Sequence, residues 1–280
     1  MAEPRVLLTG ISFGEQPRWH EDRLWFSDWG MREVIAVDLD GSSEVMLEAP
    51  AFPCCVDWLP DGRLLVVSAR DGRLLRRESD GTLVTHGDLG GLSDPPAGNE
   101  LVIDSRGNAY VNGGQALGEG SATGIIAMVS PDGAAGRVAD GLAFPNGMLV
   151  MPDARTLIVA ESYAKRLTAF EISSDGSLSN RRVWAELGDG VPDGICADAE
   201  NAIWYADVPN KRCSRVREGG DVLQTVELDR GCFACALGGP DRTILFMIAT
   251  EWNGPQGMFQ DPRTGQVLTT QVTAPGAGWP

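Results

Sequence analysis

Two carboxylates and two amides recur at equivalent places in this sequence, each nine to eleven residues before an apolar strand begins. The four side chains are those of Glu15, Asn99, Asn146 and Asp193. Each has glycine or proline beside it or one residue away, which fixes the backbone and allows a close approach. Carboxylate and amide oxygens suit Ca²⁺; Mg²⁺ and Mn²⁺ accept similar ligands, and Zn²⁺ tolerates them. We therefore expect one divalent cation where the four side chains meet.

A repeat along the chain predicts how side chains so distant in sequence come together. A turn rich in Gly and Asp is followed at once by an apolar strand six times, and these strands begin 40 to 48 residues apart. The strand starts are Leu24, Leu64, Ala109, Leu157, Ile203 and Ile244. This period is the length of one four-stranded propeller blade. The sequence therefore predicts an all-β fold, a six-bladed β-propeller with four-stranded blades around a central metal site.

We expect the ring to close within one domain that covers residues 1–280. A single four-stranded blade cannot bury both of its faces, so the blades must stack around an axis. The strand at 6–8 is expected to pair with the strand at 266–268 and to complete the last blade. The innermost strands then begin at one mouth of the ring, where the four oxygen-bearing side chains are expected.

Six cysteines and two loop tryptophans are further candidates. Cys55 stands at the blade-2 counterpart of Glu15 and is expected to line the pocket. The cysteines as a group are typical of small buried side chains in a reduced cytosol. Cys232 and Cys235 lie three apart in a predicted strand, so they are expected to point to opposite faces of it. Trp29 and Trp252 fall in predicted loops, where either could cover a substrate.

Composition and charge exclude several partners. The net charge of −16 argues against nucleic acid and against an anionic membrane surface. No basic, apolar leader precedes Glu3, and the apolar run at 243–249 is too short to span a bilayer. We expect a soluble, cytoplasmic protein; its oligomeric state is left open.

The scarcity of histidine excludes two kinds of active site. The only histidines are His20, in a predicted hairpin turn, and His86, in a predicted outer strand, and both are expected at the surface. A Ser-His-Asp triad or a histidine-rich zinc site would need one of them near the axis. No G-x-x-x-x-G-K-[ST] loop occurs either, which argues against a nucleotide cofactor.

Three segments carry a resemblance to a known family: Gly14-Glu15-Gln16-Pro17-Arg18-Trp19, Phe144-Pro145-Asn146-Gly147-Met148 and Pro192-Asp193-Gly194-Ile195-Cys196. They resemble the senescence-marker/gluconolactonase/luciferin-regenerating family, which includes regucalcin, and the likeness covers nearly the whole chain. It implies a six-bladed propeller with one axial divalent ion that hydrolyses lactones and sometimes other esters. By position, Glu15, Asn146 and Asp193 match the metal ligands, and Asp193 matches the proposed base. Asn99 matches an asparagine that contacts substrate or metal, depending on the member.

One departure from the family bears on the substrate. Members that act on sugar lactones carry an arginine two residues before the matching asparagine, where this chain has Ala97, and Glu100 stands where an aspartate usually follows. Without the hydrogen-bond donors of an arginine guanidinium group, the mouth of the ring suits a smaller or less polar lactone, or an ester. We expect Asn99, Glu100 and Cys55 to contact the substrate.

Hydrolysis of a lactone follows from this set of residues. A divalent ion would polarise the carbonyl, and Asp193 would act as general base or as nucleophile. Two alternatives stay open. One is cleavage of aryl esters or organophosphates at the same ion, and the other is a calcium-binding propeller without enzymatic activity.

Overall fold

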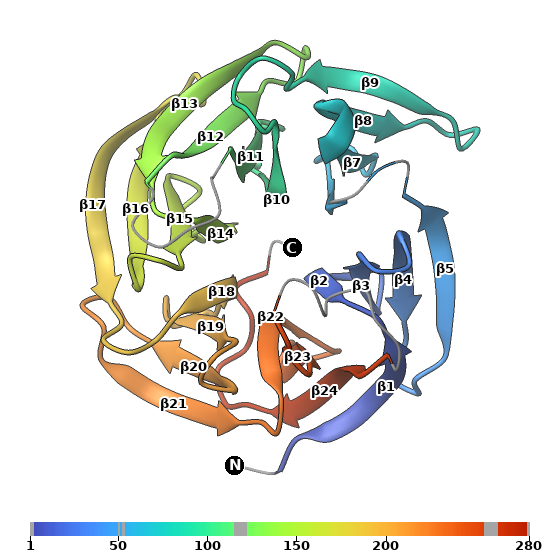
Figure 1. The fold of residues 1–280 in the computed structure, drawn as a ribbon, viewed down its shortest axis with the longest axis vertical. Helices are drawn as coiled ribbons and strands as arrows, with labels where there is room; N and C mark the ends of the chain where they lie inside the picture. Colours follow the sequence, from blue (N-terminus) through green and yellow to red (C-terminus); the bar gives the residue numbers. More distant parts are fainter. Residues whose placement is uncertain (1–2, 50, 52–53, 115–121, 255–262, 279–280) are drawn as a thin grey trace.

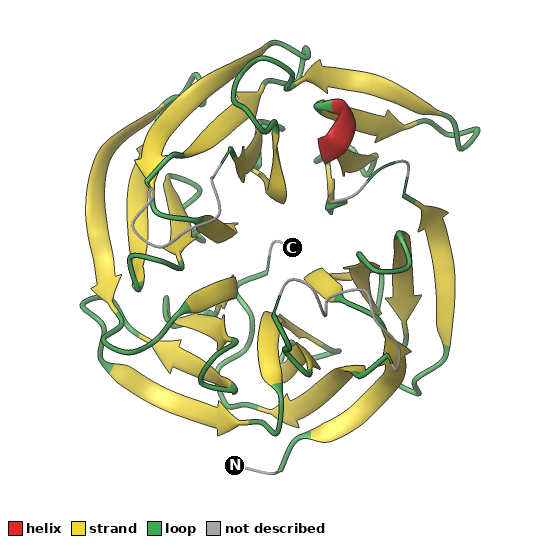
Figure 2. Ribbon diagram, viewed as in Figure 1, coloured by secondary structure: helices red, strands yellow, loops and turns green. Residues whose placement is uncertain are grey.

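The computed structural model describes residues 3–49, 51, 54–114, 122–254 and 263–278. These residues form 24 strands in six four-stranded antiparallel sheets, which are the blades of one ring (Figure 1). The predicted all-β, six-bladed architecture with four-stranded blades is confirmed. Figure 2 shows how completely strands dominate; within the described residues the one helical segment is the short turn η1 (Ala69–Asp71). No helix in this part of the chain is long and apolar enough to cross a membrane.

Each blade runs from an inner strand at the axis to an outer strand at the rim, and in blades 1 to 5 the strands follow chain order. Blade 1 contains β2 (Gly14–His20), β3 (Arg23–Asp28), β4 (Glu33–Val37) and β5 (Ser43–Glu48). Blade 2 contains β6 (Val56–Trp58), β7 (Leu64–Ser68), β8 (Arg73–Arg77) and β9 (Leu83–Asp88). Blade 3 contains β10 (Ala97–Ile103), β11 (Ala109–Gly113), β12 (Gly124–Val129) and β13 (Ala135–Leu142).

The second half of the ring repeats this order. Blade 4 contains β14 (Pro145–Val150), β15 (Thr156–Glu161), β16 (Arg166–Ile172) and β17 (Leu178–Glu186). Blade 5 contains β18 (Pro192–Ala197), β19 (Ile203–Asp207), β20 (Arg212–Val216) and β21 (Val222–Glu227). Blade 6 contains β22 (Gly231–Gly238), β23 (Ile244–Thr250) and β24 (Gly265–Gln271), with β1 (Arg5–Ile11) as its outer strand.

The repeated turns join the first two strands of every blade. Each turn contains a residue with positive φ, the conformation that lets a short turn match the twist of its strands. These residues include Asp22, Gly62, Gly107, Ala154, Asn201 and Arg242. The local turn chemistry therefore sets the period of the fold.

Pairing of β1 with β24 closes the ring, as the sequence predicts. Val6 lies opposite Leu268 and Leu8 opposite Val267 in an antiparallel ladder. In Figure 1 the first strand accordingly lies beside the last one. The N-terminal strand thus completes the blade that the C-terminal strands begin.

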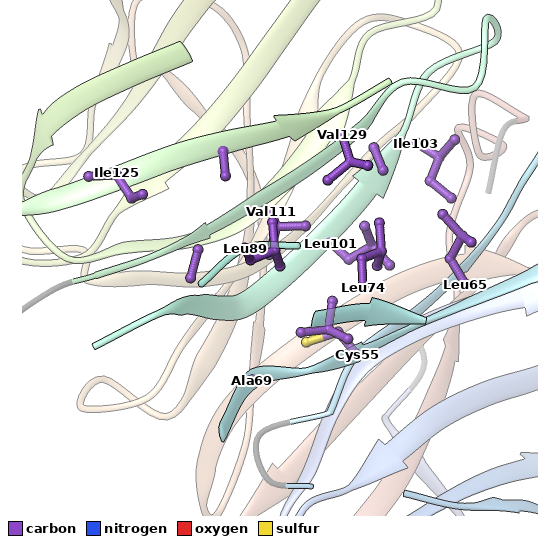
Figure 3. Close-up of a cluster of buried hydrophobic side chains, with 14 of the residues drawn as sticks. Cys55, Leu65, Ala69, Leu74, Leu89, Leu101, Ile103, Val111, Ile125 and Val129 are labelled. Atoms are coloured by element: carbon purple, nitrogen blue, oxygen red, sulfur yellow. The ribbon is translucent and has the colours of Figure 1, made fainter. Parts of the chain in front are cut away.

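Apolar side chains fill the spaces between neighbouring blades. Among the described residues, one buried cluster lies at each of the six blade interfaces. Figure 3 shows the cluster between blades 2 and 3, where Leu65 and Leu74 pack against Leu101 and Val111. These layers fix the inner strands relative to one another, and so they fix the residues at the axis.

One prediction about side-chain direction is wrong. Cys232 pairs with Ala249 and Ala234 with Ile248, so the extra residue Phe233 forms a bulge in β22. A bulge changes the alternation of side chains by one position. Cys232 and Cys235 therefore lie in the same buried layer, between blades 5 and 6.

Candidate metal centre

The four predicted ligands lie where inner strands begin, on four different blades. Glu15 is in β2, Asn99 in β10, Asn146 in β14 and Asp193 in β18, and these strands surround the axis in Figure 1. At each position the pairing with the second strand shifts register, at the residue itself or directly after it. Such bulges re-aim a side chain that regular pleating would direct toward one face of the blade.

The two amides contact each other across blades 3 and 4. Asn99 Nδ2 donates to Asn146 Oδ1 at 3.3 Å and to the carbonyl oxygen of Pro145 at 3.4 Å. Asn112 fixes the backbone beside them, because its Nδ2 donates to the Asn146 carbonyl oxygen at 2.6 Å. The structure thus brings Asn99 and Asn146 together.

The two carboxylates share a buried, negatively charged environment. Burial raises the pKa of Glu15 well above its usual range, and the charges of Asp193 and Glu100 raise it further. Burial and the charge of Glu100 likewise raise the pKa of Asp193. Asp193 Oδ1 is buried without a hydrogen-bond partner among the described residues. An unpartnered carboxylate oxygen beside other acidic groups is a position that a cation would stabilise.

Arg18 lies in the inner strand β2, three residues after Glu15, and its side chain reaches blade 3. Its Nη2 donates to Glu100 Oε1 at 3.2 Å and to the Leu101 carbonyl oxygen at 2.8 Å. Burial raises the pKa of Glu100 to about 7, although Arg18 lowers it. The carboxylate of Glu100 is thus buried and paired, and its predicted contact with substrate stays a prediction.

Cys55 supports the backbone of a predicted ligand. Its Sγ lies 3.0 Å from the Asn99 carbonyl oxygen, and the residue is 0% exposed. Burial raises the pKa of this thiol well above its usual range, so it is held in the neutral form. Its predicted role in lining the pocket remains a prediction, and a catalytic thiolate is disfavoured.

Two acidic residues that hold the loops before inner strands were missed by sequence reasoning. Asp28, at the end of β3, accepts hydrogen bonds from the backbone N–H groups of Ser12 and Phe13 at 2.9 and 3.0 Å. Glu161, at the end of β15, accepts one from Ala143 at 2.8 Å. The signal that could have found them is an acidic residue closing an otherwise apolar strand, which occurs in three of the repeats, with Asp207 at the end of β19 as the third.

An aromatic cluster lies beside the strand that carries Asp193. Phe13 and Phe233 meet edge to face at 4.6 Å between ring centroids, and Trp252 lies 5.4 Å from Phe233. The backbone of Phe233 packs against Gly194, where an added Cβ would stand 3.1 Å from the Phe233 carbonyl oxygen. Trp252 is 40% exposed, whereas Trp29 is buried.

The histidines lie away from the predicted ligands. His20 ends the strand near whose start Glu15 stands, which separates them by roughly 16 Å along the strand. His86 is 7% exposed, so the prediction that it lies at the surface is wrong. The turn at Gly133 covers it, because a Cβ there would lie 2.4 Å from the His86 carbonyl oxygen.

In the ranges that the structure describes, no three His, Cys, Asp or Glu side chains gather in a group that could hold a metal ion. The predicted set contains only two carboxylates and depends on two amide oxygens. A cation site is therefore not shown, but these residues fit one, because Asp193 Oδ1 lacks a partner and two acidic groups lie close together.

Comparison with known proteins decides the family. Residues 13–251 match the SMP-30/Gluconolactonase/LRE-like region. The chain belongs to this family. A family relative, the 6-deoxy-6-sulfogluconolactonase of Pseudomonas putida, is 26% identical over 95% of this chain and 94% of its own length. The resemblance carried by the three sequence segments is thereby confirmed, and the SMP-30/gluconolactonase family includes lactonases.

Solved structures of related proteins share the fold. A calcium-binding protein, regucalcin, from Agrobacterium tumefaciens superposes with a TM-score of 0.81 at 22% identity, covering 99% of this chain and 97% of that one. A gluconolactonase from Xanthomonas campestris gives a TM-score of 0.74 at 22% identity, with 97% and 95% covered. At these identities the likeness shows the propeller fold alone.

Proposed function

We propose that this protein is a metal-dependent hydrolase that opens a lactone ring. The observation that carries this proposal is the unpartnered, buried Asp193 Oδ1, close to the second buried acid Glu15. Charge repulsion between two such groups favours a bound cation over two protonated acids at neutral pH. Membership of a family that includes lactonases supports the reaction class.

Glu15, Asn146 and Asp193 would hold the divalent cation, Ca²⁺ in the first instance, with Asn99 as a further ligand or as a substrate contact. When bound, such an ion polarises a carbonyl oxygen and stabilises the charge that develops as the carbonyl is attacked. Asp193 would take a proton from the attacking water and return it to the ring oxygen, which leaves as an alcohol when the ring C–O bond breaks. If Asp193 instead attacks the carbonyl carbon itself, the ring oxygen takes its proton from solvent, and a water molecule then hydrolyses the acyl-enzyme to the hydroxy acid and free Asp193.

The residues around the centre favour a substrate less polar than a sugar lactone. Ala97 is completely buried and offers no side-chain donor in the place of the family's arginine. Trp252, 40% exposed, packs on the buried rings of Phe13 and Phe233 and gives this aromatic cluster an exposed apolar face. This surface also favours the second candidate, hydrolysis of an aryl ester or aryl phosphotriester at the same residues.

A panel of lactones, aryl esters and phosphotriesters tests the proposal, with pH-indicator detection in the presence and absence of Ca²⁺. We expect the protein to hydrolyse a lactone, and we expect a chelator to abolish this activity. Asp193→Asn should lower the rate of hydrolysis by on the order of a hundredfold or more. Asp189→Asn is the matched control, because Asp189 is exposed and pairs only with Arg212 among the described residues. Full activity in Asp193→Asn would reject its role. Calcium binding without cleavage of any member of the panel would favour the calcium-binding alternative.

A further inference from the structure

Four of the six cysteines gather between blades 5 and 6, outside the candidate metal centre. Cys196 is in β18, Cys213 in β20, and Cys232 and Cys235 in β22. Cys213, Cys232 and Cys235 belong to one buried cluster, and Cys196 packs against it. The bulge at Phe233 produces this gathering, because it turns Cys232 and Cys235 toward the same layer.

Two of these thiols are in van der Waals contact across the blade interface. Cys196 Sγ lies 3.7 Å from Cys235 Sγ, and the two residues are 39 positions apart in sequence. Their strands touch directly beside this contact, since an added Cβ at Gly194 would lie 2.7 Å from the Cα of Ala234. A disulfide requires about 2.05 Å between the sulfurs, so a modest rotation of the two side chains closes the remaining gap.

A pocket around the axis gives access to this pair from the end of the ring that is remote from the predicted ligands. Several of its lining residues stand three positions after a bulge residue or predicted ligand on the inner strands. These are Arg18, Val102, Leu149, Cys196 and Ala236. Cys235 also borders the pocket, and it is buried, whereas Cys196 is half-buried. Both cysteines therefore border the space that an oxidant would enter.

We propose that Cys196 and Cys235 form an oxidation site at which a hydroperoxide produces a disulfide between blades 5 and 6. The Cys235 thiolate attacks the peroxide, whose O–O bond breaks to give a Cys235 sulfenic acid; the departing oxygen takes up a proton from solvent and leaves as an alcohol, or as water from hydrogen peroxide. The sulfur of Cys196 then attacks that sulfur, and the S–O bond breaks. The departing hydroxide leaves as water with the Cys196 proton. The two thiols are oxidised by two electrons, and the peroxide is reduced by two.

The surroundings of the two sulfurs suit Cys235 as the thiolate that attacks the peroxide and Cys196 as the thiol that resolves the sulfenic acid. Burial raises the pKa of Cys235, but hydrogen bonds from the thiols of Cys196 and Cys213 outweigh burial and lower it to about 5. Burial and the hydrogen bond to Cys235 raise the pKa of Cys196 well above its usual range, so Cys196 keeps its proton. The two sulfurs are already in contact before oxidation begins.

Mass spectrometry of the full-length protein tests this site. The protein is treated with hydrogen peroxide, its remaining thiols are alkylated under denaturing conditions, and it is digested with trypsin without reduction. Cys196 falls in the tryptic peptide 183–211 and Cys235 in 231–242, whereas Cys213 falls in 213–215 and the Cys54–Cys55 pair in 33–63. We expect most of the alkylated 183–211 to be lost and replaced by a species that links it to 231–242 and that disappears on reduction.

Variants separate the two cysteines of peptide 231–242. Cys235→Ser should abolish the link, whereas Cys232→Ser and the distant control Cys54→Ser should retain it. If Cys235→Ser does not fold, Cys196→Ser at the half-buried position replaces it, with the same expected loss. Oxidation should also shift the thermal midpoint of the wild-type protein upward, reversibly on reduction, and should leave that of Cys196→Ser unshifted.

Three results would overturn the assignment. The first is that no link between peptides 183–211 and 231–242 forms in the oxidised wild-type protein. The second is that this link still forms in Cys235→Ser. The third is that peptide 183–211 is linked to peptide 213–215 instead. The readouts contain no hydrolase assay, so they stand or fall independently of the proposed lactonase activity.

Discussion

Asn99 and Asn146 contact each other at 3.3 Å although they belong to different blades. Each starts from a bulged inner strand, and the only covalent route between them runs through the whole of blade 3. Their contact shows that the inner strands of neighbouring blades present their first side chains to one another at the axis.

Removal of Asn146 should weaken cation binding. Asn146→Ala deletes one predicted ligand together with the acceptor of the Asn99 amide, and we expect Ca²⁺ affinity to fall by about 10- to 100-fold. Titration calorimetry measures this directly. Asn180→Ala is the control, since that exposed amide bonds only Glu171 among the described residues. Equal Ca²⁺ affinity of Asn146→Ala and wild type would remove Asn146 from the ligand set.

Asp57 should make the stability of the wild-type protein decrease between pH 4 and 6. Burial raises its pKa from 3.8 to about 6, although Arg18 and two backbone N–H groups lower it. The folded protein therefore binds a proton that the unfolded chain releases in this range, and the free energy of unfolding falls as pH rises, by about 3 kcal/mol in all. Urea unfolding at each pH measures it, and Asp57→Asn should lack this component. An identical slope in the variant would contradict the assignment.

Glu161 should contribute in the opposite direction. It is fully buried, yet its pKa is lowered: burial opposes ionisation, but hydrogen bonds from Ala143 and Thr168 and the charges of Arg166 and Arg181 outweigh it. Its stabilisation is present at neutral pH and is lost on acidification through the folded-state pKa. Glu161→Gln should reduce the free energy of unfolding at pH 7 by about 3 kcal/mol, because it leaves the arginines without their partner. Glu218 is exposed, so Glu218→Gln should change the free energy of unfolding little. A similar loss of stability in both variants would contradict the larger contribution expected of Glu161.

Trp252 should affect the choice among substrates more than the chemistry. Trp252→Ala removes the exposed ring of the aromatic cluster, so kcat/KM should fall about tenfold for an aryl ester and change little for a small aliphatic lactone. Trp252→Phe should restore part of the loss. Parallel losses on both substrates would indicate a general disturbance of the site instead.

The sequence predicts the architecture well because its determinants are local. Turn residues such as Gly62 and Gly107 recur once in every blade, so they are enough to place the hairpins. Counting back from the strand after each turn then locates the four candidate ligands at the starts of the inner strands. What sequence reasoning missed depends on strand register and on contacts between blades. The bulge at Phe233, the burial of His86 under another blade and the pairing of Arg18 with Glu100 each require a neighbour distant in sequence.

The shared sheet of β1 and β24 has a consequence for synthesis on the ribosome. The first strand emerges early, but its partner is translated about 250 residues later, which takes roughly 12 to 50 seconds at 5 to 20 residues per second. For that interval the nascent chain carries an unpaired edge strand, which is a ready template for association with other chains. Chaperone dependence during translation should therefore centre on the first strand and end when the last one is released.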